Sequence, residues 1–446
     1  MALGGGKWVV QNKLLPGSYV NFKSQPKITL AFADRGYAAI ALPLDWGAEN
    51  EIVTITGEGI QERCFELLGH AFTDDELRPI RTIMLGAKVL RLYNLNAGGK
   101  TAKATVGGLT VTARYPGVSG NKIAVAIAKN IDKEESYSVT TQFDGVEVDR
   151  QIIKSVGDFK SFEDGGNKFI KLEGSISNES ATVLTYLTGG ENGTTKAGAH
   201  SDFLYKVQGE YFNDIGYAGT DEEIKRLYEA FAKRMVDEVG YYMQLTVHKS
   251  NENHIAISSV DFDCTNDANK AAGVYWYLGQ SAGTQLGTNP AASIYNGEYE
   301  FTFLTDKLEA EKAIKDGKLV LHKVDGKIRL LEDVNTFTNY SKEMNEDWAL
   351  NEVVRIAFQR AKDITTLFNK YYMQKVLNNA DGRDMLWADC VYHAKEVLQN
   401  QLGVLEGYAP EDTKVEKGIQ KGGVVVYDSI TPVTTMNKLY MTIAID

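Results

Sequence analysis

The sequence has few of the residues that usually carry metal or redox chemistry. Its three cysteines, Cys64, Cys264 and Cys390, are far apart and outside any CxxC spacing. We therefore expect small buried thiols in a reducing compartment, without disulfides. The six histidines show no HxxxH or HExxH spacing, so packing or surface hydrogen bonding is the expected role of each. No metal ligand and no cofactor is predicted.

Long apolar runs and an excess of basic residues are also missing. No apolar run approaches the ~20 residues that cross a bilayer, and residues 1–10 lack the basic-then-apolar order of a signal peptide. The formal net charge of −11 argues against a nucleic-acid binder, which presents a basic face to phosphate. We therefore expect neither direct membrane insertion nor nucleic-acid binding.

Common catalytic motifs are absent as well. There is no GxSxG, no Walker A pattern and no GxGxxG after a predicted strand. One segment, Asp261-Phe-Asp263-Cys-Thr265, resembles the DxDxT nucleophile loop of Mg²⁺-dependent aspartyl-phosphate phosphatases. No later acidic pair completes such a site, and a strand-end turn with solvated carboxylates is the more ordinary interpretation. We predict that the chain is not an enzyme, with a phosphatase using Asp261 and Asp263 as the alternative.

What the chain does have is glycine, tyrosine and length. It contains 42 glycines, and its 23 tyrosines outnumber its 17 phenylalanines. This combination is typical of a protein with many turns and much contact surface, because tyrosine is favoured at interfaces. At 446 residues the chain exceeds one typical core, so several domains are expected.

Both ends of the chain are predicted to be extended. In residues 437–446, one face of a strand would carry Leu439, Met441, Ile443 and Ile445. No turn or partner strand follows them. Residues 7–22 contain two short strand-like runs broken at Pro16-Gly17. Because an isolated strand leaves its backbone N–H and C=O groups unpaired, each end either joins the chain's own sheet or is donated to a neighbour.

Between these ends the hydrophobic pattern changes twice. Residues 97–198 hold short alternating runs separated by turn residues roughly every ten positions, which is typical of an antiparallel sandwich or barrel. On both sides of this segment, strand patterns alternate with helical ones, which indicates a layered α/β domain. The predicted fold class is multidomain α+β: a mixed α/β core with an inserted all-β sandwich or barrel domain, a helical C-terminal region and extended N- and C-terminal β-arms.

The predicted domains follow from these changes. They are an N-terminal arm at 1–22, a first segment of the α/β core at 23–96, the inserted all-β domain at 97–198, a second segment of the α/β core at 199–345, a C-terminal helical/β domain at 346–432 and a C-terminal strand arm at 433–446.

Individual elements are predicted by periodicity and turn chemistry. Helices are expected at 61–71, from a Thr220–Glu223 capping box to Gly240, and at 269–280, 306–316, 347–377 and 384–401. Strands are expected within 81–92 and at 242–248, 254–260 and 422–430, with a hairpin turning at Asp325-Gly326.

One predicted helix is rich in basic residues. Between Val353 and Lys375 it carries Arg355, Arg360, Lys362, Lys370 and Lys375 against Asp363 alone. These residues form either an ordinary solvated face or a basic surface that docks on an acidic partner, since complementary charge fixes register.

Six segments in order along the chain match a known family. They are Gly6-Lys-Trp-Val-Val-Gln-Asn-Lys13 with Pro16-Gly-Ser-Tyr-Val-Asn-Phe22, Ala113-Arg-Tyr-Pro-Gly117 with Gly120-Asn-Lys-Ile-Ala-Val-Ala-Ile127, Lys318-Leu-Val-Leu321 with Glu332-Asp-Val-Asn-Thr-Phe337, Asn351-Glu-Val-Val-Arg355, Asn378-Asn-Ala-Asp-Gly-Arg383, and Ile430-Thr-Pro-Val433 with Lys438-Leu-Tyr-Met-Thr-Ile-Ala-Ile445. Over nearly its whole length, the chain resembles tail sheath proteins of contractile phage tails, including the sheaths of phage-tail-like bacteriocins of Gram-positive bacteria.

The resemblance implies a structural subunit made in the bacterial cytoplasm and built into a virion tail or a released tail-like particle. Such subunits form a helical homopolymer around an inner tube, and the polymer contracts to drive the tube through a cell envelope. Implied partners are other copies of the chain, the inner tail tube protein, and baseplate and tail terminator proteins.

The resemblance also implies roles for particular residues. Terminal strands would pair with sheets of neighbouring copies, while the basic residues of the C-terminal helix would face the tube and the inserted β domain would face outward. The residues concerned are Trp8, Val9, Val10, Leu439, Tyr440, Met441, Thr442, Ile443 and Ile445 in the arms, and Arg355, Arg360, Lys362 and Lys370 facing the tube.

A third hypothesis is a baseplate or adhesive component whose β domain binds carbohydrate. Only Tyr115, Tyr137 and Tyr186 supply tyrosines in that domain, so an aromatic sugar-binding cluster is not expected.

Overall fold

The computed structural model describes residues 35–96, 98–130, 135–176, 183–195 and 197–445, together with the backbone of two short strands near the N-terminus. The chain divides into two units, residues 1–34 and 35–446. In the first unit, β1 (Gly4–Gly6) and β2 (Gly17–Tyr19) pair in parallel. The arm residues Trp8, Val9 and Val10 lie outside the described residues, so their predicted role stays a prediction. All further description concerns the second unit.

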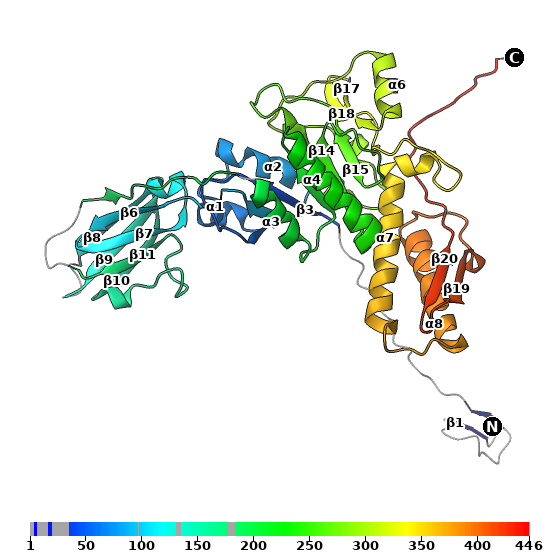
Figure 1. Ribbon diagram of the computed structural model, residues 1–446, viewed down its shortest axis with the longest axis horizontal. Coiled ribbons are helices and arrows are strands. Elements are labelled where there is room, and N and C mark those ends of the chain that lie inside the picture. Colours follow the sequence, from blue (N-terminus) through cyan, green and yellow to red (C-terminus); the bar gives the residue numbers. More distant parts are fainter. Residues whose placement is uncertain are drawn as a thin grey trace. The chain divides into compact units, whose positions relative to one another are not determined.

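A seven-stranded sheet lies at the centre of the second unit (Figure 1). Its order is β16-β15-β14-β13-β3-β5-β4, and every neighbouring pair is parallel except β4 with β5. The strands are β3 (Tyr37–Leu42), β4 (Ile52–Thr56), β5 (Val89–Asn94), β13 (Asp214–Tyr217), β14 (Gln244–His248), β15 (Ile257–Val260) and β16 (Lys318–Leu319). The inner strands are short apolar runs because a mostly parallel sheet is covered on both faces.

Helices cover the two faces of this sheet. Ala38 and Ile40 of β3 share one apolar cluster with α1 (Ile60–Leu68), α2 (Arg78–Met84) and α5 (Gly273–Gly283). Ala39, on the opposite face of the same strand, packs with α3 (Ala197–Val207) and α4 (Glu222–Lys233). The alternation of side chains along β3 thus contributes to two separate cores.

Close contact between α2 and α5 depends on a glycine. A Cβ at Gly279 would lie 2.1 Å from the carbonyl oxygen of Ile83. Any larger residue at this position would therefore push the two helices apart, so the glycine sets the thickness of this layer.

The all-β domain is a sandwich inserted between β5 and α3. One sheet has the order β10-β9-β8-β12 and the other β11-β7-β6. The strands are β6 (Thr101–Val106), β7 (Leu109–Pro116), β8 (Ile123–Lys129), β9 (Tyr137–Phe143), β10 (Val146–Ile153), β11 (Ile170–Gly174) and β12 (Thr185–Tyr186), with 3₁₀ turns η2 (Val118–Lys122) and η3 (Val156–Asp158). Inward side chains of both sheets form one core, which also includes Trp46 from the segment after β3.

Smaller elements complete the central region. The hairpin of β17 (Leu321–Val324) and β18 (Lys327–Leu330) turns through Asp325 and Gly326, which both have positive φ, as the predicted Asp-Gly turn requires. The remaining elements are η1 (Asp75–Leu77), the π-helical η4 (Arg234–Val239), η5 (Lys270–Ala272), η6 (Pro290–Ala292) and α6 (Lys307–Lys315).

The C-terminal region is helical and ends in a small hairpin. It comprises η7 (Glu346–Ala349), α7 (Asn351–Leu367), η8 (Phe368–Tyr372), α8 (Ala380–Tyr392), η9 (His393–Gln401), η10 (Pro410–Asp412), β19 (Thr413–Lys417) and β20 (Val424–Asp428). The π-helical segments η8 and η9 continue α7 and α8 directly. Among the helices described, none combines the length and apolar character needed to cross a membrane.

Two local predictions were wrong in part. The strand expected within 81–92 is divided between α2, which begins at Arg78 with Pro79 in its first turn, and β5. The apolar residues of α2 lie on one face of the helix, the face that packs on α5. In so short a segment, a continuous apolar run predicts a strand and a buried helix equally well. At the start of α4, Asp221 caps the helix in place of Thr220, since its side chain accepts hydrogen bonds from the N–H groups of Glu223 and Ile224.

Candidate assembly surfaces

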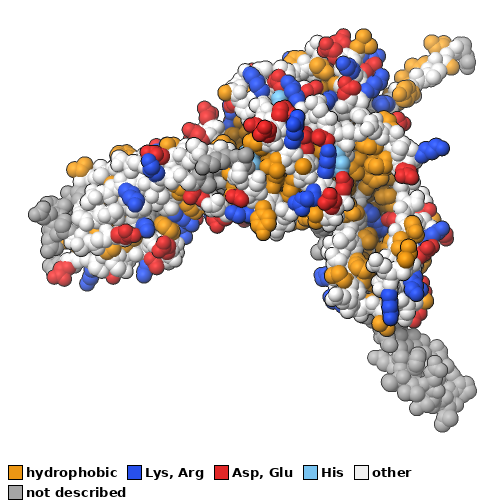
Figure 2. Space-filling view, viewed as in Figure 1, with side chains coloured by type: hydrophobic (Ala, Val, Ile, Leu, Met, Phe, Trp, Pro, Cys, Tyr) orange, Lys and Arg blue, Asp and Glu red, His pale blue; other side chains and the backbone are white. Residues whose placement is uncertain are grey.

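The last residues of the chain form an exposed apolar tail, defined here as residues 436–445. All ten of these side chains are exposed, and the large apolar ones are 71 to 103% exposed: Met436, Leu439, Tyr440, Met441, Ile443 and Ile445. Figure 1 shows the tail leaving the body of the second unit, and Figure 2 shows apolar side chains along it. A run of exposed apolar residues of this kind usually marks a surface that another molecule covers.

The predicted C-terminal strand is not formed within this chain. Residues 437–445 belong to no strand of the described structure. The alternation that predicted a strand is nevertheless present in the sequence. Strand geometry requires a partner for the backbone groups, and no described strand of the same chain pairs with the tail.

The start of the tail, in contrast, is fixed to the body. The buried carboxylate of Glu352 accepts hydrogen bonds from the Thr435 N–H at 3.0 Å and the Thr435 hydroxyl at 3.1 Å. The Asn437 side-chain amide donates to Glu332 at 3.0 Å. The tail therefore leaves the body from a defined point beside α7.

The hairpin of β19 and β20 pairs with no further strand among the described residues. The two strands pair through five residues each and form a sheet of their own in the described structure. Helix α8 packs on β19, and the Trp387 indole N–H donates to the Thr413 carbonyl oxygen at 2.9 Å. Val425 and Tyr427 of β20 are exposed. An open strand edge presents unpaired N–H and C=O groups and is a template for strand addition.

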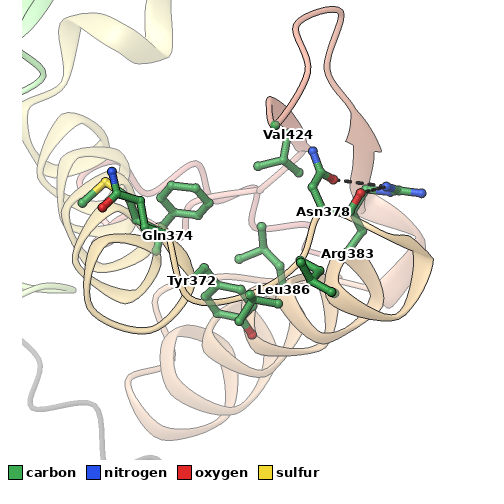
Figure 3. Close-up of a pocket in the computed structure, with 12 residues that line it drawn as sticks. Tyr372, Gln374, Asn378, Arg383, Leu386 and Val424 are labelled. Atoms are coloured by element: carbon green, nitrogen blue, oxygen red, sulfur yellow. Dashed lines mark hydrogen bonds between the residues drawn. The ribbon is translucent and has the colours of Figure 1, made fainter.

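A groove of about 300 Å³ lies beside this hairpin (Figure 3). Its wall is mainly apolar and includes Phe368, Tyr372, Leu386 and Val424. At one end the Arg383 guanidinium donates to the Asn378 side-chain oxygen at 3.1 Å. The groove is therefore suited to an apolar side chain projecting from a strand that pairs near β20.

The basic surface predicted on the C-terminal helix is wrong for Arg355. This side chain is 1% exposed, and its guanidinium donates to the buried carboxylate of Asp333. The Asp333 carboxylate also accepts hydrogen bonds from the Tyr277 hydroxyl and from the Asn351 amide, at 2.5 and 3.1 Å. Arg355 thus belongs to an internal polar network between α7, α5 and the segment after β18.

Arg360 is also buried and paired within the chain. Its guanidinium donates to Asp428 at 2.8 Å and to Nδ1 of His393 at 2.8 Å. The His393 Nε2 lies 2.9 Å from Asp363. These contacts join α7 to η9 and to the end of β20, so Arg360 is unavailable to a partner.

The two lysines differ from each other. Lys362 is half-buried, with its ammonium 5.1 Å from the Tyr211 ring centre and 5.3 Å from that of Tyr241. Burial lowers the pKa of Lys362 to about 8. Lys370 is exposed, so of the four residues predicted to face the tube, only Lys370 is fully at the surface.

A signal for this burial is present in the sequence but was missed. Asn351, Arg355, Gln359 and Asp363 recur every four residues, which places them on one face of a helix, and all four are buried. Strand β19 was missed too, although its alternating sequence precedes the glycine-containing turn of the C-terminal hairpin.

The phosphatase alternative gains no support from its loop. Nε2 of His248 and Nζ of Lys249 lie 2.9 and 2.6 Å from Asp263. Burial alone would raise the pKa of Asp263, but these two contacts outweigh it and lower the pKa. The grouping of three possible metal-ligating side chains found in the described residues includes neither Asp263 nor Asp261.

The carbohydrate-binding alternative also gains no support from the positions of its tyrosines. Tyr115 packs edge-on against the buried Trp46, with ring centres 5.3 Å apart, while Tyr186 is exposed on β12. The two rings therefore have separate surroundings.

Family comparisons cover nearly all of the second unit. Residues 35–95 match the family model of the tail sheath protein Gp18 domain III N-terminal region. Residues 96–192 match the phage tail sheath protein beta-sandwich domain, residues 193–336 its central domain, and residues 343–446 the phage tail sheath C-terminal domain.

Individual proteins and structures agree with these matches. The phage-like element PBSX protein XkdK of Bacillus subtilis is 23% identical across the full length of both chains. The crystal structure of a sheath tail protein from Desulfitobacterium hafniense is 26% identical, with a TM-score of 0.77 over 94% of this chain and 100% of that one. The helical sheath of the anti-feeding prophage in its contracted state shares the fold, at 12% identity and a TM-score of 0.53 over 97% of this chain and 100% of that one.

Proposed function

Because this chain belongs to the family of contractile phage tail sheath proteins, we propose that its copies polymerise around an inner tube by exchanging terminal strands, and that the polymer contracts to drive the tube through a cell envelope. Membership of this family supports the role of a structural sheath subunit in a virion tail or a tail-like particle. We propose that the subunit is made in the bacterial cytoplasm and assembles with the inner tail tube, baseplate and tail terminator proteins.

The exposed tail is the observation that carries this proposal. Leu439, Met441, Ile443 and Ile445 alternate along it and are all exposed, so the same residues would share one face of a strand. Burying each would contribute roughly 1.5–3 kcal/mol before the cost of ordering the tail. A neighbouring copy would supply both the missing backbone partner and the apolar cover.

We further propose that the acceptor is the hairpin of β19 and β20. It is small, no further strand of the described residues pairs with it, and an apolar groove adjoins it. One edge would take the C-terminal tail of one neighbour. The other edge would take the N-terminal arm of a second neighbour, including Trp8, Val9 and Val10, which remain predicted contacts. This is strand addition used as a mechanical link.

Contraction would then move near-rigid bodies joined by flexible links. The buried pairs of Arg355 with Asp333 and of Arg360 with Asp428 tie α7 to its surroundings and favour a body that moves as a unit. A change in packing between bodies, with the links kept, is a known kind of large transition. Tube contact would involve Lys370, with the β-sandwich facing outward.

The test is to compare the full chain with a chain that ends at Thr435. The shortened chain keeps the hydrogen bonds of Thr435 to Glu352. The full chain is expected to form tubes or helical polymers in electron micrographs. The shortened chain should remain a folded monomer by sedimentation and circular dichroism. A matched control is Leu308→Ser, which removes an exposed apolar side chain on α6 and should leave polymers unchanged.

A second pair of variants separates strand pairing from apolar association. Successive N–H groups of a strand point to opposite edges, so the double variant Tyr440→Pro, Met441→Pro removes one donor from each edge. Tyr440→Ser, Met441→Ser changes the side chains but keeps both donors. Strand exchange predicts that proline abolishes polymers more completely than serine. Equal polymerisation of the proline variant and the full chain would refute it, as would unfolding of the chain that ends at Thr435.

A further inference from the structure

A buried histidine follows the last turn of α1. His70 is 2% exposed, and its Nε2 lies 2.7 Å from Asp45 Oδ1. The other oxygen of Asp45 accepts a hydrogen bond from the Ser119 hydroxyl at 2.9 Å. A carboxylate can only accept, so Nε2 carries the proton. In the neutral ring, Nδ1 therefore presents a lone pair.

That lone pair is directed at two carboxylates. His70 Nδ1 is buried and has no hydrogen-bond partner among the described residues. It lies 3.8 Å from Asp74 Oδ2 and 3.7 Å from Glu76 Oε2, too far for a hydrogen bond. These three ligand atoms lie within 4.8 Å of one another. A buried nitrogen without a hydrogen-bond partner that lies near two anionic oxygens is unfavourable unless a proton on the nitrogen or a bound cation stands between them.

We propose that His70 Nδ1, Asp74 and Glu76 bind a divalent transition-metal ion, with Zn²⁺ as the representative case. One imidazole nitrogen with two carboxylates suits Zn²⁺ better than Mg²⁺ or Ca²⁺, which take oxygen ligands. Two tetrahedral ligands, each ~2.0–2.1 Å from one ion, stand roughly 3.3 Å apart. The distances from Nδ1 to the Asp74 and Glu76 oxygens would therefore shorten by about 0.4–0.5 Å, and Glu76 is exposed enough to move.

The surroundings of the three ligands fit this assignment. Asp45 holds the far nitrogen of His70, which is the carboxylate–histidine–metal arrangement that orients a metal-bound ring. The Ala71 N–H donates to Asp74 Oδ2 at 2.8 Å and so fixes that carboxylate. The site lies toward solvent at Glu76, which leaves a coordination position for water.

The role that follows is structural. Asp74 and Glu76 lie in the connection from α1 to α2, while His70 reaches through Asp45 to Ser119 in η2 of the β-sandwich. An ion bound here would therefore link the α1–α2 connection, through His70 and Asp45, to the η2 turn of the β-sandwich. No such site was expected from the histidine spacings, because the pattern His70-x₃-Asp74-x-Glu76 contains one histidine and relies on carboxylates.

The test is zinc binding by the full chain after removal of metals with a chelator. Elemental analysis after dialysis against micromolar Zn²⁺ should give one ion per chain, and Co²⁺ should give a visible absorption band. The double variant Asp74→Asn, Glu76→Gln should bind at least tenfold more weakly, with its circular dichroism unchanged. The matched control is Glu309→Gln, Glu311→Gln, which removes two exposed carboxylates from α6 and should bind like the original chain.

Two outcomes would overturn the assignment. One is equal zinc affinity of the original chain and the Asp74→Asn, Glu76→Gln variant, which would place bound zinc elsewhere. The other is an unchanged NMR signal of the His70 ring nitrogens on adding Zn²⁺, which would exclude Nδ1 as a ligand without relying on any variant.

Discussion

Helix α7 and the C-terminal tail distribute polar and apolar residues in opposite ways. One face of α7 buries Asn351, Arg355, Gln359 and Asp363, while the tail exposes leucine, methionine and isoleucine. In α7 every charge on that face finds a partner within the same chain, as Arg355 finds Asp333. In the tail, the apolar side chains find none among the described residues.

The difference separates what holds one subunit together from what is left for another. Buried charges are costly unless paired, so the network around Arg355 specifies one arrangement of the body. Exposed apolar residues contribute nothing to the isolated chain, but they supply a driving force as soon as a surface covers them. The buried charges on α7 therefore stabilise the fold, whereas the exposed apolar residues of the tail stay available for the assembly proposed above.

The largest effect on stability is expected from Arg355→Met. This change leaves the Asp333 carboxylate buried without its charge partner, which costs about 3–5 kcal/mol in the free energy of unfolding. Urea denaturation measures it. The matched control, Lys370→Met on the exposed side of the same helical segment, should change the value by less than about 0.5 kcal/mol. A loss below about 1 kcal/mol for Arg355→Met would mean that α7 has no structural charge network.

A smaller loss is expected from Asn351→Leu. The Asn351 amide donates to Asp333, Tyr277 and the Val334 carbonyl oxygen, and its own oxygen accepts from Gln244 at 2.7 Å. Removing these hydrogen bonds leaves several buried polar groups unsatisfied, which should lower the free energy of unfolding by about 1–3 kcal/mol. Asn369→Leu, at an exposed position of η8, is the control in the same urea measurement. An equal loss in the free energy of unfolding for both variants would mean that the buried hydrogen bonds of Asn351 do not stabilise the fold.

A pH dependence is expected from His393. Burial lowers the pKa of this ring below its ordinary value of about 6.5, although its contact with Asp363 acts in the other direction. As pH falls through ~6.5 the unfolded chain takes up a proton that the folded chain refuses, so stability decreases. The free energy of unfolding should therefore fall between about pH 7.5 and about pH 5.5, and it should fall less in His393→Gln. An identical fall in both proteins would assign the dependence to other groups.

The smallest effect on stability is expected in the tail. Changing Leu439, Met441, Ile443 and Ile445 together to serine should alter the free energy of unfolding by less than about 0.5 kcal/mol, because all four are exposed. The same variant should lose polymerisation in sedimentation and electron microscopy. A large loss of stability would show that the tail packs on its own chain and would remove the contrast with α7.

How far the sequence predicts this molecule depends on whether the determining contacts are local. The hairpin at Asp325-Gly326 was predicted correctly because two neighbouring residues set the turn. The β-sandwich was predicted correctly because its alternation repeats over many strands. The helix at α2 was missed because its short apolar stripe was interpreted as part of a strand, although Pro79 in its first turn is a local signal for the start of a helix.

The candidate surfaces divide in the same way. The apolar alternation of the tail was visible in the sequence, whereas the formation of a strand depends on a partner strand, which none of the described residues supplies. The basic surface was wrong for Arg355 and Arg360 because counting charges along α7 does not reveal Asp333 and Asp428, which come from distant segments. Ion pairs between segments far apart in sequence are set by tertiary structure alone.

The length of the tail limits how far from its own subunit the tail can reach. Its last hydrogen bond to the body is that of Asn437 to Glu332, and the eight residues from Lys438 to Ile445 reach at most ~26–29 Å when fully extended. A subunit that accepts this tail must therefore keep its receiving edge inside a sphere of that radius, however the subunits turn. Within the sphere, tethering would keep the local concentration of the tail high, so a strand of the proposed link that separated would be recaptured quickly. If the proposed strand exchange holds, lengthening or shortening the segment between Asn437 and the apolar residues of the tail should change which spacings of neighbouring subunits the tail can span.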